Sequence, residues 1–400
     1  MGRSLLMAGG ANSNPVNNQF QGMAFANIGP TGTEANNQIK IRAGGTIQGL
    51  GVLSTVAATS YTATLRINGA NAANTVNASG IQTVSDTTHS DPIAVGDLVC
   101  TTYTSVSGAA VATVVFAVFR ATGNHTALYF GQTNSVVTTT ASATRFCPYS
   151  RSGNPSATEA NVQVKLRAAG TIKNASIFVS ANATTGTSTY TNRVNGVNGA
   201  LTIAIGAGLT GLFEDTTHSD TVASGDLLCG QFVTGATGGV SYNVFGVHFE
   251  AAAATGPAND VFGYASSATL AASGTGTAYL IAGRIAAFGE TFQAFPVGYA
   301  VQISNLRIFL SANTYAANAT FTLRKNLADA PNSTVSLTAG VTGWFEDNTH
   351  SDLYAATDIV AVQIVGGTSG SITIQTVATT WLDVTPPPFP RTNRLAPLRM

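Results

Sequence analysis

Three copies of one motif constrain the fold of this chain more than any other feature. Residues 86–100 read DTTHSDPIAVGDLVC, residues 215–229 read DTTHSDTVASGDLLC, and residues 347–361 read DNTHSDLYAATDIVA. The histidines of the copies, His89, His218 and His350, lie 129 and 132 residues apart. This period is far longer than the roughly 20–50 residues of a solenoid repeat, so each copy predicts one domain of a tandem array.

Other segments recur in the same order around the motif, and their composition is that of short strands. TEANNQIKIRAGGTI (33–47) matches TEANVQVKLRAAGTI (158–172), and IFVSAN (177–182) matches IFLSAN (308–313). Runs rich in Val, Ile, Thr, Phe and Tyr alternate with Gly, Asn, Asp and Ser clusters, without a long helical period. We therefore predict an all-β chain of three tandem antiparallel β-sandwich domains. With about eight strands per unit, a jelly roll is favoured over the shorter immunoglobulin-like sandwich.

The repeats divide the chain into five parts. We predict an irregular N-terminal arm (1–19), β-sandwich repeats at 20–125, 126–256 and 257–384, and a Pro-rich basic C-terminal arm (385–400). The C-terminal arm has no acids, and its proline run favours an extended conformation. It is either a disordered tail or an assembly arm that lies across a neighbouring subunit. In the second case its contacts come from Phe389, Arg391, Arg394, Leu395 and Leu398.

Charge is scarce and balanced. Eighteen Lys and Arg residues oppose eighteen Asp and Glu residues, and charged residues make up 9% of the chain, against about 25% in a typical soluble domain. This balance argues against partners bound by bulk electrostatics, so we expect neither a nucleic acid nor a membrane. The apolar stretch 5–8 is shorter than the roughly 7–15 residues of a secretory signal. We therefore expect no signal peptide and synthesis in the cytoplasm.

The three cysteines, Cys100, Cys147 and Cys229, cannot all pair within one chain and lack metal-ligand spacing. Cys100 and Cys229 are equivalent, but the third copy has Ala361 at that position. We expect reduced thiols that serve as small apolar core residues, and no cofactor.

Most of the acids occupy repeated positions, which indicates a role common to the three units. Arg66, Arg193 and Arg324 are repeated as well. We expect each arginine to pair with one of the repeated acids, because an unpaired charge inside a neutral sandwich is costly. Besides the acids of the histidine motif, the repeated acids are Glu34, Glu159 and Glu290, and Asp97, Asp226 and Asp358.

The histidine motif itself permits two interpretations. Its carboxylates and imidazole could bind a metal ion, or its Asp and Thr side chains could bond nearby backbone N–H groups and lock a strand connection. We favour the second. The metal candidates of the first are Asp86, His89, Asp91, Asp215, His218, Asp220, Asp347, His350 and Asp352.

The same motif places a serine beside a histidine and an aspartate, as in a hydrolytic triad. These serines are Ser90, Ser219 and Ser351. Triad members meet in space from separate segments, and neighbours on one turn rarely point at each other. We therefore expect no enzymatic activity.

With its "TLRxNG … GLFEDTTHSD … GDLxC" units and its Thr-, Asn-, Gly- and Ala-rich composition, the chain resembles jelly-roll proteins on the surface of bacteriophage particles. These include head decoration proteins, head fibres and tail-fibre modules. The resemblance implies a non-enzymatic virion protein that forms homo-oligomers, commonly trimers, and contacts capsid or tail subunits. One chain could instead form a pseudo-threefold by itself.

The alternative function is a tail-fibre or adhesin module that binds host-surface glycans through loops at the sandwich ends. Glycan sites use exposed aromatic side chains. Because both tryptophans, Trp344 and Trp381, lie in the third copy, we expect such a site to be confined to that copy.

Overall fold

The computed structural model describes residues 3–9, 17–27, 31–54, 60–107, 113–122, 126–149, 155–252, 258–264, 269–271, 277–281, 284–286, 290 and 295–384. Over these ranges the chain is all-β and almost entirely antiparallel, with short 3-10 helices η1 (Glu34–Asn37) and η2 (Glu159–Asn161) and no α-helix. No helix in these ranges is long and apolar enough to cross a membrane. The predicted all-β class is confirmed.

The first unit consists of two facing sheets. Its strands are β1 (Arg3–Gly9), β2 (Gln19–Gln21), β3 (Ala24–Asn27), β4 (Ile39–Lys40), β5 (Gly45–Ser54), β6 (Ser60–Ile67), β7 (Ala70–Ser79), β8 (Gln82–Ser85), β9 (Ser90–Ile93), β10 (Leu98–Ser107) and β11 (Thr113–Ala121). One sheet has the order β3-β1-β11-β5-β8, with β9 also on β5. The other has the order β2-β10-β6-β7, with β4 also on β10.

The predicted irregular N-terminal arm is wrong for residues 3–9. Strand β1 pairs antiparallel with β11 from Arg3↔Arg120 to Gly9↔Val114, and it pairs parallel with β3. The apolar run Leu5–Ala8 thus adds a strand to the sheet and covers the backbone groups that β11 would otherwise leave unpaired.

The second unit follows the same plan with fewer strands. Its strands are β12 (Thr126–Thr139), β13 (Thr144–Cys147), β14 (Val164–Lys165), β15 (Gly170–Asn182), β16 (Ser188–Val194), β17 (Val197–Ile205), β18 (Gly211–Val222), β19 (Leu227–Val233) and β20 (Val240–Ala251). The sheets have the orders β12-β20-β15-β18 and β13-β19-β16-β17, with β14 also on β19.

The third unit repeats this plan. Its strands are β21 (Ala258–Tyr264), β22 (Thr269–Ala271), β23 (Thr277–Ile281), β24 (Arg284–Ala286), β25 (Phe295–Pro296), β26 (Val301–Asn313), β27 (Ala319–Lys325), β28 (Ala328–Leu337), β29 (Gly343–Tyr354), β30 (Ile359–Val365) and β31 (Ser371–Asp383). The sheets have the orders β21-β31-β26-β29, with β22 also on β31, and β24-β23-β30-β27-β28, with β25 also on β30.

All three units share the strand order of a jelly roll. Counted along the chain, the main strands of one sheet are the first, eighth, third and sixth, and those of the facing sheet are the second, seventh, fourth and fifth. This order wraps two Greek keys around one core. In unit 2 that core contains Ile172 and Ile177 of β15, Tyr190 of β16 and Phe245 of β20, all fully buried.

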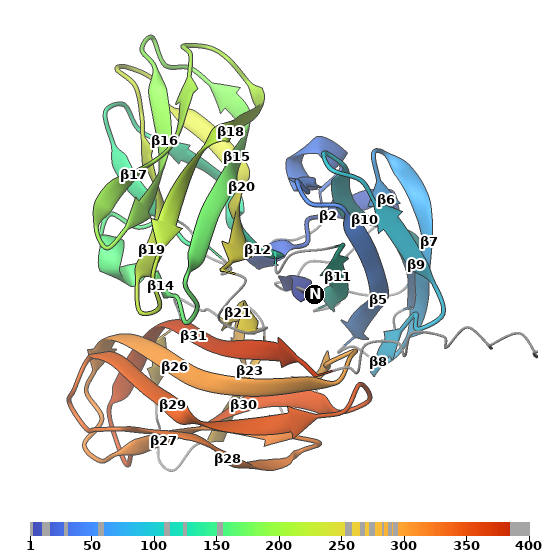
Figure 1. Ribbon diagram of the computed structural model, residues 1–400, viewed down its shortest axis with the longest axis vertical. Coiled ribbons are helices and arrows are strands. Elements are labelled where there is room, and N and C mark those ends of the chain that lie inside the picture. Colours follow the sequence, from blue (N-terminus) through green and yellow to red (C-terminus); the bar gives the residue numbers. More distant parts are fainter. Residues whose placement is uncertain are drawn as a thin grey trace, which may run out of the picture.

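The three units are arranged in a ring (Figure 1), and the apolar core of each unit continues into the next. The apolar cluster of unit 1 includes Phe130 and Val244 of unit 2, and that of unit 2 includes Ala378 of unit 3. The cluster of unit 3 includes Phe116 and Val118 of unit 1, which closes the ring. We call the 1–2, 2–3 and 3–1 junctions the first, second and third contacts.

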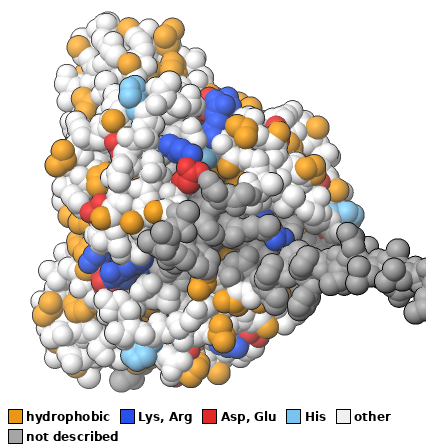
Figure 2. All heavy atoms as spheres, viewed as in Figure 1, with side chains coloured by type: hydrophobic (Ala, Val, Ile, Leu, Met, Phe, Trp, Pro, Cys, Tyr) orange, Lys and Arg blue, Asp and Glu red, His pale blue; other side chains and the backbone are white. Residues whose placement is uncertain are grey.

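Ion pairs reinforce the first two contacts. At the first, Nζ of Lys40 lies 2.9 Å and Nε of Arg42 lies 2.8 Å from the carboxylate of Glu214. At the second, Lys165 and Arg167 bind the carboxylate of Glu346, the arginine through Nη2. Figure 2 shows blue and red side chains gathered where the lobe of unit 2 meets its neighbours, on a face that is mostly white and orange.

The third contact lacks these ion pairs. Strand register places Pro296 at the position of Lys40 and Lys165, so Gly298 takes the position of Arg42 and Arg167. On the opposite side, Ser85 takes the position of Glu214 and Glu346. The acid and the bases are therefore absent together from this contact.

We expect Glu214→Gln and Glu346→Gln each to destabilise the chain by about 2 kcal/mol, because each leaves two cations without their carboxylate at a largely buried junction. Thermal unfolding should show each variant melting several degrees below the parent chain. Ser85→Ala, the matched change at the third contact, should leave the melting temperature nearly unchanged. An equal effect of Ser85→Ala would contradict the assigned role of the ion pairs.

Candidate functional site

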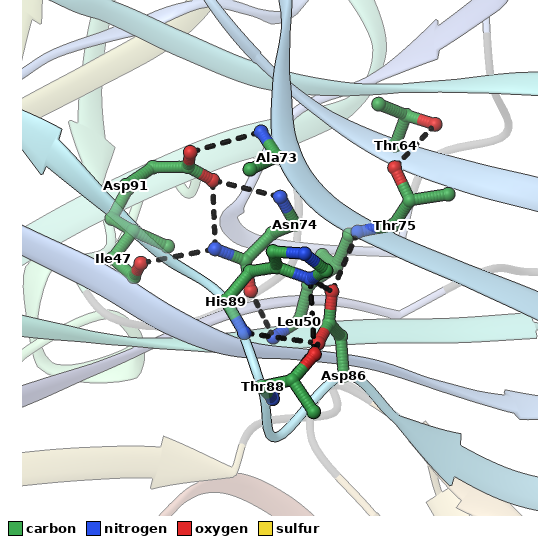
Figure 3. A network of polar contacts seen from close by, with 10 residues as sticks. All are labelled: Ile47, Leu50, Thr64, Ala73, Asn74, Thr75, Asp86, Thr88, His89 and Asp91. Atoms are coloured by element: carbon green, nitrogen blue, oxygen red, sulfur yellow. Dashed lines mark hydrogen bonds and ion pairs between the residues drawn. The ribbon is translucent and has the colours of Figure 1, made fainter.

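The repeated histidine motif forms a tight turn organised by its first aspartate (Figure 3). In unit 1, Asp86 accepts hydrogen bonds from the backbone N–H of Thr88 at 3.0 Å and of His89 at 3.2 Å. It also accepts from the Thr88 hydroxyl and from Nδ1 of His89, at 2.8 and 2.7 Å. A fifth bond, 3.0 Å long, comes from the backbone N–H of Thr75 on β7, in the facing sheet.

The second aspartate of the motif also binds the facing sheet. Asp91 accepts from the backbone N–H groups of Ala73 and Asn74, both at 2.9 Å, and from the Asn74 side chain at 2.7 Å. Both carboxylates are buried, with Asp86 8% and Asp91 6% exposed. Both carboxylates face β7 of the facing sheet, at different positions along it. Their oxygens accept hydrogen bonds from the backbone N–H groups of this strand.

Unit 2 repeats this arrangement, and unit 3 repeats the bonds within the turn and those of the second aspartate. Asp215 accepts from Thr202, Thr217 and His218, while Asp220 accepts from Ala200 and Asn192. In unit 3, Asp347 accepts from Thr349 and His350, while Asp352 accepts from Asn332 and Ser333. The favoured prediction, that these side chains lock a strand connection, therefore describes the observed bonding.

The hydrogen bonds of Asp86 and Asp215 hold these two carboxylates in their charged form. Burial acts to raise the pKa of Asp86, but the bonds from Thr75, Thr88 and His89 outweigh it and hold the pKa well below its usual value. The pKa of Asp215 is lowered in the same way. Asp86 and Asp215 thus stay ionised and act as acceptors only.

Each motif histidine is oriented by its aspartate. Because a carboxylate only accepts hydrogen bonds, Nδ1 of His89 must carry the proton, and Nε2 is left as the acceptor in the neutral ring. The His89 side chain is 53% exposed, and those of His218 and His350 are 61% and 57% exposed. Each of the three turns thus presents one exposed imidazole whose tautomer is fixed and whose Nε2 is the acceptor of the neutral ring.

The described residues of the histidine motif have neither the geometry of a metal site nor that of a hydrolytic triad. Among the residues that the structure describes, no three His, Cys, Asp or Glu side chains form a group that could hold a metal ion. Within the same residues, the histidines bond the motif threonine and aspartate, and no hydrogen bond joins Ser90, Ser219 or Ser351 to its neighbouring histidine.

The repeated arginines pair with repeated glutamates, as expected. Arg66 binds both carboxylate oxygens of Glu34 in a fork, at 2.8 and 3.0 Å. The equivalent pairs are Arg193 with Glu159 and Arg324 with Glu290.

The remaining repeated acids close turns. Each accepts a hydrogen bond from an asparagine side chain and one from the backbone N–H three residues before it. These acids are Asp97, Asp226 and Asp358.

The cysteines are buried and free, as expected. Burial raises the pKa of Cys147 to about 12, so this thiol is not activated at neutral pH. Trp381 is fully buried, which removes it from any glycan site, and the ring of Trp344 packs against Phe309 with centroids 5.3 Å apart.

The predicted contacts of the C-terminal arm lie outside the described residues. These are Phe389, Arg391, Arg394, Leu395 and Leu398.

Sequence reasoning missed His248, which lies at the first contact. It is 1% exposed, and its Nε2 accepts a hydrogen bond of 3.3 Å from the backbone N–H of Arg42. The equivalent residues are Val118 in unit 1 and Thr380 in unit 3. A histidine within the otherwise apolar run 244–249 of β20 was the available signal.

We expect acid to destabilise the first contact through His248. Burial lowers the pKa of His248 to about 3, from about 6.5 in an unfolded chain. Between these pH values the unfolded chain binds more protons, so the free energy of unfolding falls as the pH decreases, by up to about 1.4 kcal/mol per pH unit. Urea unfolding at several pH values should show this slope, and His248→Thr, which copies unit 3, should reduce it. An unchanged slope in that variant would count against the assignment.

Comparison with known proteins adds little to this geometry. No protein-family model and no curated protein sequence matches the chain. Among solved structures, the chain is similar to dimeric latent PorU from Porphyromonas gingivalis, with a TM-score of 0.24 and 9% sequence identity. The alignment covers 84% of this chain and 33% of that chain, so this chain spans about a third of that protein's length. A likeness at this TM-score carries no argument about fold or function.

Proposed function

We propose that the chain is a non-enzymatic structural protein of a bacteriophage virion, carried on the particle surface as a capsid decoration or fibre component. The observation that carries this proposal is the closed ring of three jelly rolls. Particles are built from symmetric units, and the jelly roll is a common architecture of capsid domains. A ring with pseudo-threefold symmetry is suited to a position of threefold or near-threefold symmetry on such a particle.

The use of charge supports a structural role. The motif carboxylates, the repeated Arg–Glu pairs and the acids at the ring contacts are each engaged by backbone groups or cations of the same chain. Little charge is left to repel neighbouring molecules, which favours dense packing against other virion proteins.

We propose that one closed ring, rather than a trimer of chains, is the unit that assembles on the particle. The head-to-tail surfaces that a homotrimer would use already meet within the chain. Light scattering should therefore give the mass of a single chain, 40.7 kDa at full length, and a single-chain mass again when residues 385–400 are removed. A mass three times larger that collapses on removal of this segment would overturn the single-ring unit and establish the C-terminal arm as a subunit clamp.

The virion assignment is tested on particles. We expect an antibody against the purified chain to label particles that are banded by density from lysates of the producing cells, and immunogold electron microscopy to place the label on the capsid. Label on tail fibres would favour the adhesin alternative. Recovery of the chain solely in particle-free fractions would contradict a virion role.

A further inference from the structure

A cavity of about 340 Å³ lies at the third contact, between unit 1 and unit 3. Unit 1 contributes Ser85, Thr87 and His89, and unit 3 contributes Gly298 and Thr357. Cavities that bind small molecules have volumes of roughly 300–1,000 Å³. The volume is therefore suited to a small ligand that contacts both units.

The cavity follows from the short residues at this contact. At the first contact, Arg42 reaches Glu214 across the junction at 2.8 Å. At the third contact, Gly298 and Ser85 hold these two positions, and both line the cavity. The space that an arginine and a glutamate fill elsewhere in the ring is open here.

The lining fits a neutral ligand that is rich in hydroxyl groups. Serine and threonine hydroxyls, together with the Gln48 amide, supply donors and acceptors, and none of the described residues that line the cavity is a Lys, Arg, Asp or Glu. Phe116 and Val118 supply apolar surface on one side. A sugar ring combines hydroxyl groups at its rim with apolar C–H faces, whereas a phosphate or carboxylate would find no lysine or arginine among the described lining residues.

His89 gives this lining a fixed acceptor. Its Nδ1 donates to Asp86 at 2.7 Å, which leaves Nε2 as an acceptor for a ligand hydroxyl. Because Asp86 is itself held by backbone N–H groups, the imidazole ring of His89 is oriented before any ligand binds.

We propose that the cavity at the third contact binds a neutral sugar residue, with Nε2 of His89 accepting a hydrogen bond from a sugar hydroxyl. The site occurs once per ring, because the first and second contacts are filled by Arg–Glu pairs. This goes beyond the structural role proposed above and does not depend on it. It also differs from a glycan site on the sandwich-end loops of the third copy.

The proposal is tested by saturation-transfer NMR on the full chain with glucose, galactose, mannose, N-acetylglucosamine and N-acetylgalactosamine. We expect at least one sugar to receive saturation. His89→Ala should weaken its Kd roughly tenfold, the loss expected for one hydrogen bond. Ser85→Gln should abolish binding, because it places in the cavity a side chain shaped like Glu214 and Glu346, which the other two units accommodate at this position.

The matched control is a His218→Ala/His350→Ala variant, which removes the equivalent histidines at the other two turns. It should bind as tightly as the parent chain, and melting temperatures should show that all variants are folded. A lack of response to all five sugars would overturn the proposal. So would binding that is unchanged in both His89→Ala and Ser85→Gln.

Discussion

The carboxylates of the repeated turn join the two sheets of each sandwich at their open edge. In a jelly roll the fifth and sixth strands end their respective sheets on the same side, and the backbone N–H groups of an edge strand need acceptors. In unit 1, Asp86 and Asp91 supply them to three successive residues of β7. Asp86 and Asp91 lie next to β8 and on β9, at the edge of the sheet that faces β7. Their bonds to β7 therefore fix the distance between the two sheet edges and cover the core behind them. Among the acids that recur along this sparsely charged chain, the aspartates of the histidine motif serve this purpose.

Closed units can then associate through their remaining faces. Each unit presents the loop after a short strand, β4, β14 or β25, to the outer face of the next unit. Such a head-to-tail contact either closes into a ring or continues as a filament. Here the covalent order of the units and the fit of the third contact favour closure. The apolar clusters that span the junctions carry the association, and the ion pairs at two of them fix its register.

The sequence predicted the fold of a unit better than the way the units meet. Repetition and strand periodicity act within a unit, and they were sufficient to predict the jelly roll and the pairing of Arg66 with one of the repeated acids. Contacts between units join different positions of different copies, so no single repeated motif reveals them. The sequence did contain one indication of these contacts. The third copy has Pro296 and Gly298 at the positions of Lys40 and Arg42, and the first copy has Ser85 at the position of Glu214. The strand over residues 3–9 was missed because the Gly- and Asn-rich sequence around it resembles a linker.

Covalent linkage of the three units has a consequence for how the ring can change. In an assembly of identical chains, every substitution appears at each equivalent junction, so a change that opens one contact weakens them all. In this chain a substitution alters one junction and leaves the other two intact. Gly298 is an example: the third contact has a glycine where the other two contacts have Arg42 and Arg167. Fusion thus separates the residues that maintain the scaffold from those that can diverge.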